Sequence, residues 1–162
     1  MVQIENSFDL DLRPEQAWRV VGDLSDVASW VPGVVTAHLV GDLRVCRTAD
    51  GQEIQERLSS VEGERMAYRY EHLVTPAPIR DSWGILRVRP RDRGCAVEWY
   101  AAFEHADPAR ADQITAMMRA NVADALESLR RRIETAPVTD HGCIGAAPPR
   151  LTLRTRRANV TG

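Results

Sequence analysis

The sequence contains no lysine, and all 21 of its basic residues are arginine. Catalysis through a Schiff base on a lysine side chain is therefore excluded, and arginine supplies every fixed positive charge among the side chains. Basic residues are not in excess either, because 23 acidic residues leave a net charge of -2 at pH 7. Proteins that bind nucleic acids through electrostatic attraction carry a clear positive surplus. We therefore expect no nucleic-acid partner.

Cysteines and cofactor motifs are also scarce. The three cysteines, Cys46, Cys95 and Cys143, include no CxxC pair, which argues against a disulfide framework or a cysteine zinc cluster. The four histidines show no spacing typical of a metal site. No GxGxxG motif, P-loop or GxSxG nucleophile motif is present. The sequence thus predicts a protein without a metal ion or a cofactor.

Long apolar runs are missing as well. No segment approaches the length needed to span a membrane. The first twelve residues contain Glu5, Asp9 and Asp11, where a signal peptide would have a basic start and an apolar stretch. We expect a cytoplasmic protein with no membrane partner. Hydrophobic residues make up 44% of the 162, which is sufficient for the core of one folded domain.

The order of the periodic segments predicts an α+β fold. Residues 2–12 alternate between apolar and polar, which indicates a half-buried strand. Residues 14–24 form a predicted helix that begins at a proline, and residues 25–31 form a second short helix with a serine cap. From residue 34 to 106, six short alternating runs are separated by turn signals, which is typical of successive antiparallel strands. Residues 108–134 form the longest amphipathic helix.

This order of elements predicts a ligand cavity. One apolar face of the curved sheet needs a cover, and the C-terminal helix is the only predicted element long enough to provide it. A sheet that curves around a helix leaves space that side chains do not fill, and such space binds ligands. Residues 135–162 instead combine proline, glycine and arginine with little periodicity. We predict one domain over residues 1–134, followed by a tail over residues 135–162.

A buried ion pair is expected on the third and fourth strands. A three-residue loop over residues 49–51, with glycine in the left-handed position, would place Arg44 opposite Glu56 on an apolar face. A two-residue loop would instead place Glu56 opposite Val45; we favour the first register. One interpretation of such a pair is a structural salt bridge at the edge of the sheet. The other is a functional role, because burying an ion pair rarely gives net stability. In the functional interpretation, Arg44 polarises a carbonyl or binds an enolate, and Glu56 orients Arg44 or acts as a base.

Alternation over residues 65–73 places Tyr68, Tyr70 and His72 on one inward face. The tyrosines either pack in the core or bond a ligand oxygen, and Tyr70 could also donate a proton during dehydration. His72 lies near the end of the strand, where it is either solvated or an acid or base. The candidate catalytic residues are Arg44, Glu56, Tyr70 and His72.

Aromatic, methionine and amide side chains supply the predicted cavity wall. Trp99 alternates inward, whereas Trp83 has the opposite phase unless a kink at Gly84 turns it inward. Core packing is the alternative for both tryptophans. Asn121 lies on or beside the apolar stripe of the long helix, where a polar side chain needs a partner such as a ligand. The full predicted ligand-binding set is Trp30, Tyr68, Trp83, Trp99, Phe103, Met117, Met118 and Asn121.

Short sequence elements occur in a characteristic order along residues 1–134. They are Trp18 with Val20 and Asp23, Trp30, Gly41 with Arg44, Asp50-Gly51, Glu56-Arg57-Leu58, Tyr68 with Tyr70, Trp83 with Leu86 and Val88, Val97 with Trp99 and Phe103, and Arg119-Ala120-Asn121. In this order the chain resembles the START-like, helix-grip superfamily (SRPBCC), which includes polyketide cyclases, aromatases and the birch-pollen allergen type of carrier. The element at residues 119–121 is most similar to the aromatase and cyclase branch.

The resemblance implies a helix-grip fold, with a seven-stranded curved antiparallel sheet wrapped around a long C-terminal helix and two short helices after the first strand. It also implies a cavity for a hydrophobic small molecule, either polyketide-like or a lipid. The implied activity is aldol-type ring closure and dehydration of a polyketide, as in antibiotic biosynthesis. The alternative is a non-catalytic carrier, and a third hypothesis is a protein-interaction module that uses the exposed sheet or the tail. Both a monomer and a homodimer fit the resemblance.

The polar candidates favour an enzyme over a carrier. Burying about 400 Å² of an apolar ligand gives roughly 10 kcal/mol before the cost of association, at about 25 cal/mol per Å². A carrier would therefore bind well without a buried arginine, glutamate or tyrosine.

Overall fold

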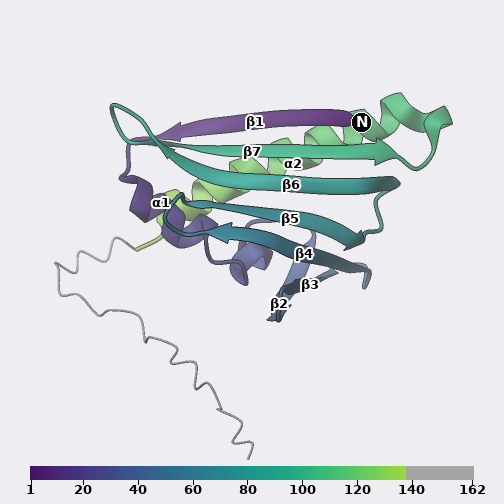
Figure 1. Cartoon of the computed structure of the whole chain (residues 1–162), viewed down its shortest axis with the longest axis horizontal. Helices are drawn as coiled ribbons and strands as arrows, with labels where there is room; N and C mark the ends of the chain where they lie inside the picture. The colour runs from purple at the N-terminus through teal and green to yellow at the C-terminus, as the bar shows by residue number, and fades with distance from the viewer. Residues whose placement is uncertain (138–162) are drawn as a thin grey trace, which may run out of the picture.

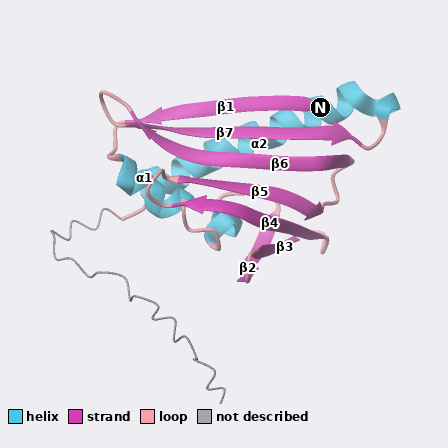
Figure 2. Cartoon of the chain, viewed as in Figure 1, coloured by secondary structure: helices cyan, strands magenta, loops and turns pink. Residues whose placement is uncertain are grey.

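The computed structural model describes residues 1–137, which form one antiparallel sheet and its covering helices (Figures 1 and 2). The sheet has seven strands in the order β1-β7-β6-β5-β4-β3-β2. The elements are β1 (Val2–Leu10), α1 (Pro14–Val21), η1 (Asp26–Ser29), β2 (Val34–Val40), β3 (Leu43–Thr48), β4 (Glu53–Glu62), β5 (Ala67–Val74), β6 (Ile79–Pro90), β7 (Cys95–His105), η2 (Pro108–Arg110) and α2 (Ala111–Thr135).

The strand predictions are confirmed. All six strands expected between residues 34 and 106 are present. The first strand, β1, pairs with β7 and forms one edge of the sheet. The loop between β3 and β4 has three residues, since the Thr48 amide donates to the Gln52 carbonyl at 2.9 Å and Gly51 has a φ of +84°. This loop sets Arg44 opposite Glu56, as the favoured register predicted.

The region after β1 differs from the prediction of two short helices. The α-helix α1 ends at Val21, and the second helix is a single 3-10 turn, η1. Ser25 does not cap η1, because its hydroxyl donates to Asp23 Oδ1 at 2.7 Å instead. Residues 1–137 therefore contain one short and one long α-helix. The segment over residues 26–29 forms only the tighter turn.

The long helix α2 lies behind the sheet and crosses β1 and β7 (Figure 1). Its buried residues recur at helical spacing on the face turned toward the sheet. Near its C-terminal end, Arg132 Nη2 donates to Asp26 Oδ2 at 3.1 Å, which ties α2 to η1. One side of the sheet is thus covered by α2, as the sequence predicted for its apolar face, and η1 packs against β2.

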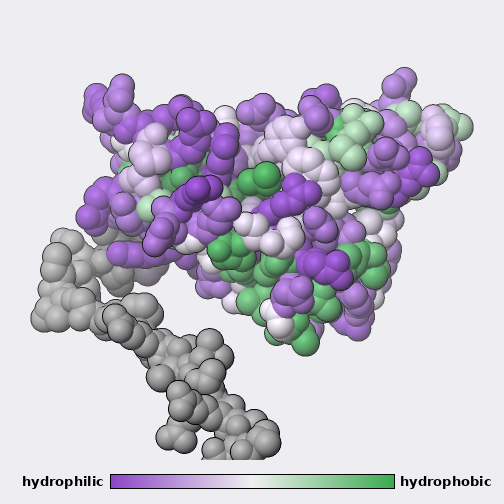
Figure 3. Space-filling view, viewed as in Figure 1, coloured by the Kyte–Doolittle hydropathy of each residue, from purple (hydrophilic) through white to green (hydrophobic). Residues whose placement is uncertain are grey.

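The opposite side of the molecule is mainly hydrophilic, with apolar side chains gathered over the strands at the lower end of the view (Figure 3). Val35, Leu39 and Val40 of β2 are among the exposed hydrophobic residues. Within residues 1–137, no helix is long and apolar enough to cross a membrane. The predicted tail, except for its first three residues, lies outside the described residues, so the division into domain and tail remains a prediction.

Candidate functional site

A hollow of about 510 Å³ lies between the sheet, η1 and α2. Its walls are mostly apolar, but one side carries charged and hydroxyl groups from β3, β4, β5 and β6. Ten of the twelve predicted site residues line it: Arg44, Glu56, Tyr70, His72, Trp30, Tyr68, Trp99, Phe103, Met118 and Asn121. The space that the fold argument predicted is therefore present, and it is bordered by the expected mixture of side chains.

The central polar group is the ion pair between β3 and β4. Arg44 Nε donates to Glu56 Oε2 at 2.6 Å, and the two residues are only 3% and 8% exposed. Arg44 Nη1 also donates to the Leu24 carbonyl at 3.4 Å, and its guanidinium lies 5.6 Å from the ring centre of Tyr68. The cation is thus held against the wall of the hollow by contacts on several sides.

His72 extends this polar group across two more strands. Its Nε2 lies 3.4 Å from Glu56 Oε1, and its Nδ1 lies 2.9 Å from the Ser82 hydroxyl oxygen. Burial lowers the pKa of His72 below its ordinary value, against the opposing effect of the Glu56 charge. His72 is therefore neutral at pH 7 and can serve as a base.

Sequence reasoning missed Ser82, which is 7% exposed and lines the hollow. A signal for it was available, because Ser82 shares its alternation phase with Leu86 and Val88, which both face the core. A serine adds little to an apolar pattern, so this phase alone did not single it out.

Tyr70 is fixed by a close approach to the neighbouring strand. A Cβ at Gly84 would overlap the Tyr70 hydroxyl, so only glycine leaves room for the ring there. Trp99 Nε1 donates to the Tyr70 hydroxyl oxygen at 3.0 Å. Burial raises the pKa of Tyr70. The hydroxyl therefore stays protonated and acts as a neutral hydrogen-bond donor.

Two further donors in the hollow are unused. Trp30 Nε1 and the Tyr68 hydroxyl are buried and have no hydrogen-bond partner among the described residues. Leaving a buried donor unpaired costs about 1–3 kcal/mol. Both groups are thus available to a polar atom of a ligand.

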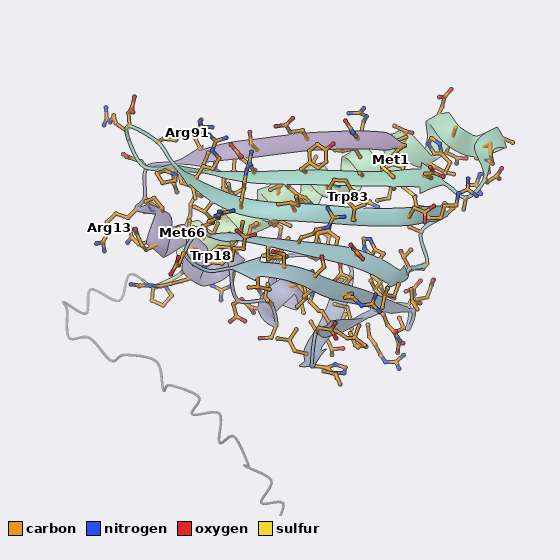
Figure 4. All side chains as sticks on the ribbon, in the orientation of Figure 1. Met1, Arg13, Trp18, Met66, Trp83 and Arg91 are labelled. Atoms are coloured by element: carbon orange, nitrogen blue, oxygen red, sulfur yellow. The ribbon has the colours of Figure 1, made fainter. Side chains whose placement is uncertain are left out.

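Trp83 and Met117 do not line the hollow. Trp83 lies on β6 (Figure 4), where the Arg69 guanidinium is 4.0 Å from its ring centre and Tyr100 packs beside it. The predicted kink at Gly84 does not turn Trp83 inward, because this glycine instead accommodates Tyr70. Met117 is 37% exposed, and the neighbouring Met118 takes the inward position on α2.

The mouth of the hollow is acidic. Asp50 from the β3–β4 loop and Asp124 from α2 line it, together with Asn121, and all three are exposed. Hydrogen bonds from Thr48 and Gln52 lower the pKa of Asp50. The charged groups that line the hollow are therefore three carboxylates and one guanidinium, which disfavours an anionic ligand. No cluster of possible metal ligands occurs within residues 1–137.

The lowered pKa of His72 predicts a loss of stability in mild acid. Below pH 6.5 the unfolded chain binds a proton at His72 that the folded chain does not yet bind, so stability falls as the pH drops from 6.5 toward the folded-state pKa. The slope contributed by one such group is at most about 1.4 kcal/mol per pH unit. Urea unfolding between pH 5 and 7.5 should show a flatter profile for His72→Gln than for the wild type.

His38 offers the matched control, because it is exposed on β2 and lies outside the hollow. The His38→Gln profile, measured in parallel, shows whether the loss of a histidine outside the hollow has the same effect. A His72→Gln profile as steep as that of the wild type would contradict the assignment of this acid sensitivity to His72.

Comparison with known proteins assigns the chain to one family. Residues 1–134 match the family described as polyketide cyclase / dehydrase and lipid transport. A search of curated proteins found no match. Among solved structures, protein XoxI from Bacillus cereus is 22% identical, with a TM-score of 0.75 over 83% of this chain and 97% of that one.

Two other solved structures are similar. A protein from Thermobifida fusca is 27% identical, with a TM-score of 0.69 over 82% of this chain and 93% of that one. The di-domain ARO/CYC protein BexL from the BE-7585A biosynthetic pathway is 17% identical, with a TM-score of 0.73 over 85% of this chain and 48% of that one. These likenesses establish the helix-grip fold, and the match over residues 1–134 shows that the chain belongs to the polyketide cyclase / dehydrase and lipid transport family.

Proposed function

We propose that the protein binds a neutral, polyketide-like molecule in the hollow and promotes aldol-type ring closure followed by dehydration. The observation that carries this proposal is the buried Arg44–Glu56 pair, which borders an apolar space together with Tyr70 and His72. A binding protein gains little from an ion pair in such a place, since desolvation offsets most of the attraction. An enzyme that forms an enolate needs a base to remove the proton, and a fixed positive charge is one of the groups that stabilise the developing oxyanion.

In the proposed reaction, Glu56 removes a proton from the carbon between two carbonyl groups of the substrate. The developing enolate oxygen is stabilised by the Arg44 guanidinium, whose position is fixed by Glu56 and the Leu24 carbonyl. The enolate carbon then attacks a second carbonyl and closes the ring. Tyr70 donates a hydrogen bond to the resulting alkoxide oxygen, and Glu56 gives its proton to that oxygen to form the alcohol. Glu56 then removes the second proton from the attacking carbon, and it passes this proton to the hydroxyl group, which leaves as water while the C=C bond forms.

The apolar walls supply the positioning. Trp30 and Trp99 meet edge to face with ring centres 6.0 Å apart, and Phe103 and Met118 also line the hollow. The walls hold the substrate in a folded conformation in which the two reacting carbons are close together. This positioning alone lowers the activation barrier by several kcal/mol. The acidic mouth favours a substrate without a negative charge.

The test compares ring closure with binding in three variants. For Glu56→Gln and Tyr70→Phe we expect turnover of a synthetic poly-β-ketone to fall by about 100-fold or more, the usual contribution of acid–base groups. Binding of an apolar aromatic analogue should change by only a few fold, as measured by calorimetry. Trp83→Phe, outside the hollow, should leave both quantities unchanged.

Product distributions give the decisive outcome. If chromatography finds the same cyclised products and rates with wild type, Glu56→Gln and no protein, ring closure is excluded. Retained binding of the analogue in that case would favour the alternative, a carrier of an apolar small molecule.

A further inference from the structure

We propose that Ser82, His72 and Glu56 form a nucleophile–base–carboxylate triad that cleaves an activated acyl ester whose apolar acyl chain lies in the hollow. The three side chains come from neighbouring strands, β6, β5 and β4, and all of them line the hollow. The Ser82 oxygen is 2.9 Å from His72 Nδ1, and His72 Nε2 is 3.4 Å from Glu56 Oε1. This arrangement is that of a serine nucleophile, its base and the group that orients the base.

The register between β5 and β6 places Ser82 next to His72. Tyr70 pairs with Gly84 and Glu71 with Trp83, so His72 and Ser82 occupy the next inward positions where regular β5–β6 pairing ends. The β6–β7 register also shifts between Arg80 and Trp83. A bulge of this kind re-aims a side chain, and bulges are frequent beside active sites.

Asp81, directly before Ser82, has a φ of +47°. A non-glycine residue in this region costs about 1–3 kcal/mol and persists only when the surrounding structure enforces it. The strained residue lets both Ile79 and Ser82 point into the protein, where they are 7% exposed each. The strain is therefore located directly before the proposed nucleophile.

The charge state of the triad suits proton abstraction from serine. Glu56 is an ion-pair partner of Arg44, and its second oxygen faces His72 Nε2. A carboxylate beside Nε2 favours the tautomer with the proton on that nitrogen. Nδ1 is then free to accept the Ser82 hydroxyl proton, and burial keeps the ring neutral by lowering its pKa.

In the proposed acyl transfer, Ser82 Oγ attacks the carbonyl carbon of the ester while its proton moves to His72 Nδ1. The bond between the carbonyl carbon and the leaving oxygen or sulfur then breaks, and His72 returns the proton to the departing alcohol or thiol. Water next attacks the acyl-serine and gives one proton to His72. The acyl–Oγ bond breaks, Ser82 regains its proton, and a carboxylic acid is released.

Tyr70 supplies a donor for the carbonyl oxygen. Its hydroxyl lies over Gly84, two residues along β6 from Ser82, and its oxygen accepts the Trp99 indole proton. The tyrosine proton remains available, and a preorganised donor near a developing oxyanion accelerates such reactions. Ring closure, by contrast, has no step at Ser82, so this activity goes beyond the proposed cyclase function.

The first experiment measures hydrolysis of p-nitrophenyl esters with acyl chains of two to ten carbons, and of the decanoyl thioester of N-acetylcysteamine. We expect the protein to prefer the longer chains, and Ser82→Ala to lose at least 100-fold in kcat/KM. Ser59→Ala, an exposed serine on β4, should behave as the wild type. Cleavage of both substrate types indicates a general acyl hydrolase, and cleavage of only one identifies the leaving group.

The second experiment detects the nucleophile directly. Intact-mass analysis after treatment with an alkyl fluorophosphonate should show one added label, mapped to Ser82 and absent from Ser82→Ala and His72→Gln. An unlabelled wild-type protein that also fails to hydrolyse any of these substrates would overturn the proposal. So would equal hydrolysis by wild type and Ser82→Ala. Poly-β-ketone cyclisation by the wild-type protein is measured separately, so that a failure of ester hydrolysis and a failure of ring closure are told apart.

Discussion

Arg44→Met is expected to lower the free energy of unfolding by about 3–5 kcal/mol, which is the usual cost of leaving one buried charge without its partner. Glu56 is only 8% exposed and, among residues 1–137, would keep no cation within ion-pair distance except a protonated His72. Removing the arginine also frees the Leu24 carbonyl from its contact with Nη1. Urea or thermal unfolding at pH 7 measures the effect.

The double variant separates charge from shape. In Arg44→Met with Glu56→Leu, both charges are replaced by apolar side chains, and such exchanges are often neutral or even stabilising. We expect the double variant to be more stable than Arg44→Met alone. If the two substitutions simply added, as independent sites do, the pair would not act as one buried unit.

Gly94→Ala, which adds a single methyl group, should lower the free energy of unfolding by about 3 kcal/mol or more. Gly94 ends the loop between β6 and β7 with a φ of +70°, which disfavours any residue with a Cβ. That Cβ would also overlap the backbone carbonyl oxygen of Leu10 in β1, and backbone cannot move aside as a flexible side chain can. A change in the midpoint of urea unfolding at constant slope is the expected signature.

Gly63 provides the control for this substitution. It lies in the β4–β5 turn, and a Cβ there would meet nothing within 4 Å. Gly63→Ala should therefore leave stability within about 0.5 kcal/mol of the wild type, as for most surface substitutions. Equal effects at the two glycines would refute the close approach of Gly94 to β1.

Most of the sheet was predictable because its strands alternate between a covered and a solvated face. The same alternation predicted that Tyr68, Tyr70 and His72 would share the inward face, and turn chemistry at Gly51 predicted the register of Arg44 and Glu56. These are local signals that the tertiary structure does not override. The second helix is shorter than predicted, and the expected Ser25 cap is absent because the Ser25 hydroxyl bonds Asp23 instead.

The rest of the site depends on contacts between distant strands. Gly84 suggested a kink, but its lack of a side chain instead admits Tyr70 from β5, and this could only be seen with both strands in place. The bulge at Asp81 likewise has no signature in an alternating pattern. On α2, Met117 and Met118 are one position apart, and only the packed helix shows which of them faces the hollow.

The placement of the indole rings has a practical consequence. Of the four tryptophans, Trp30 and Trp99 border the hollow and contact each other, whereas Trp18 and Trp83 lie outside it. Because indole fluorescence depends on the polarity around the ring, the chain carries its own optical reporter of occupancy. A bound ligand changes the surroundings of Trp30 and Trp99, whose fluorescence should therefore shift. The surroundings of Trp18 and Trp83 stay the same, so these two residues serve as an internal reference.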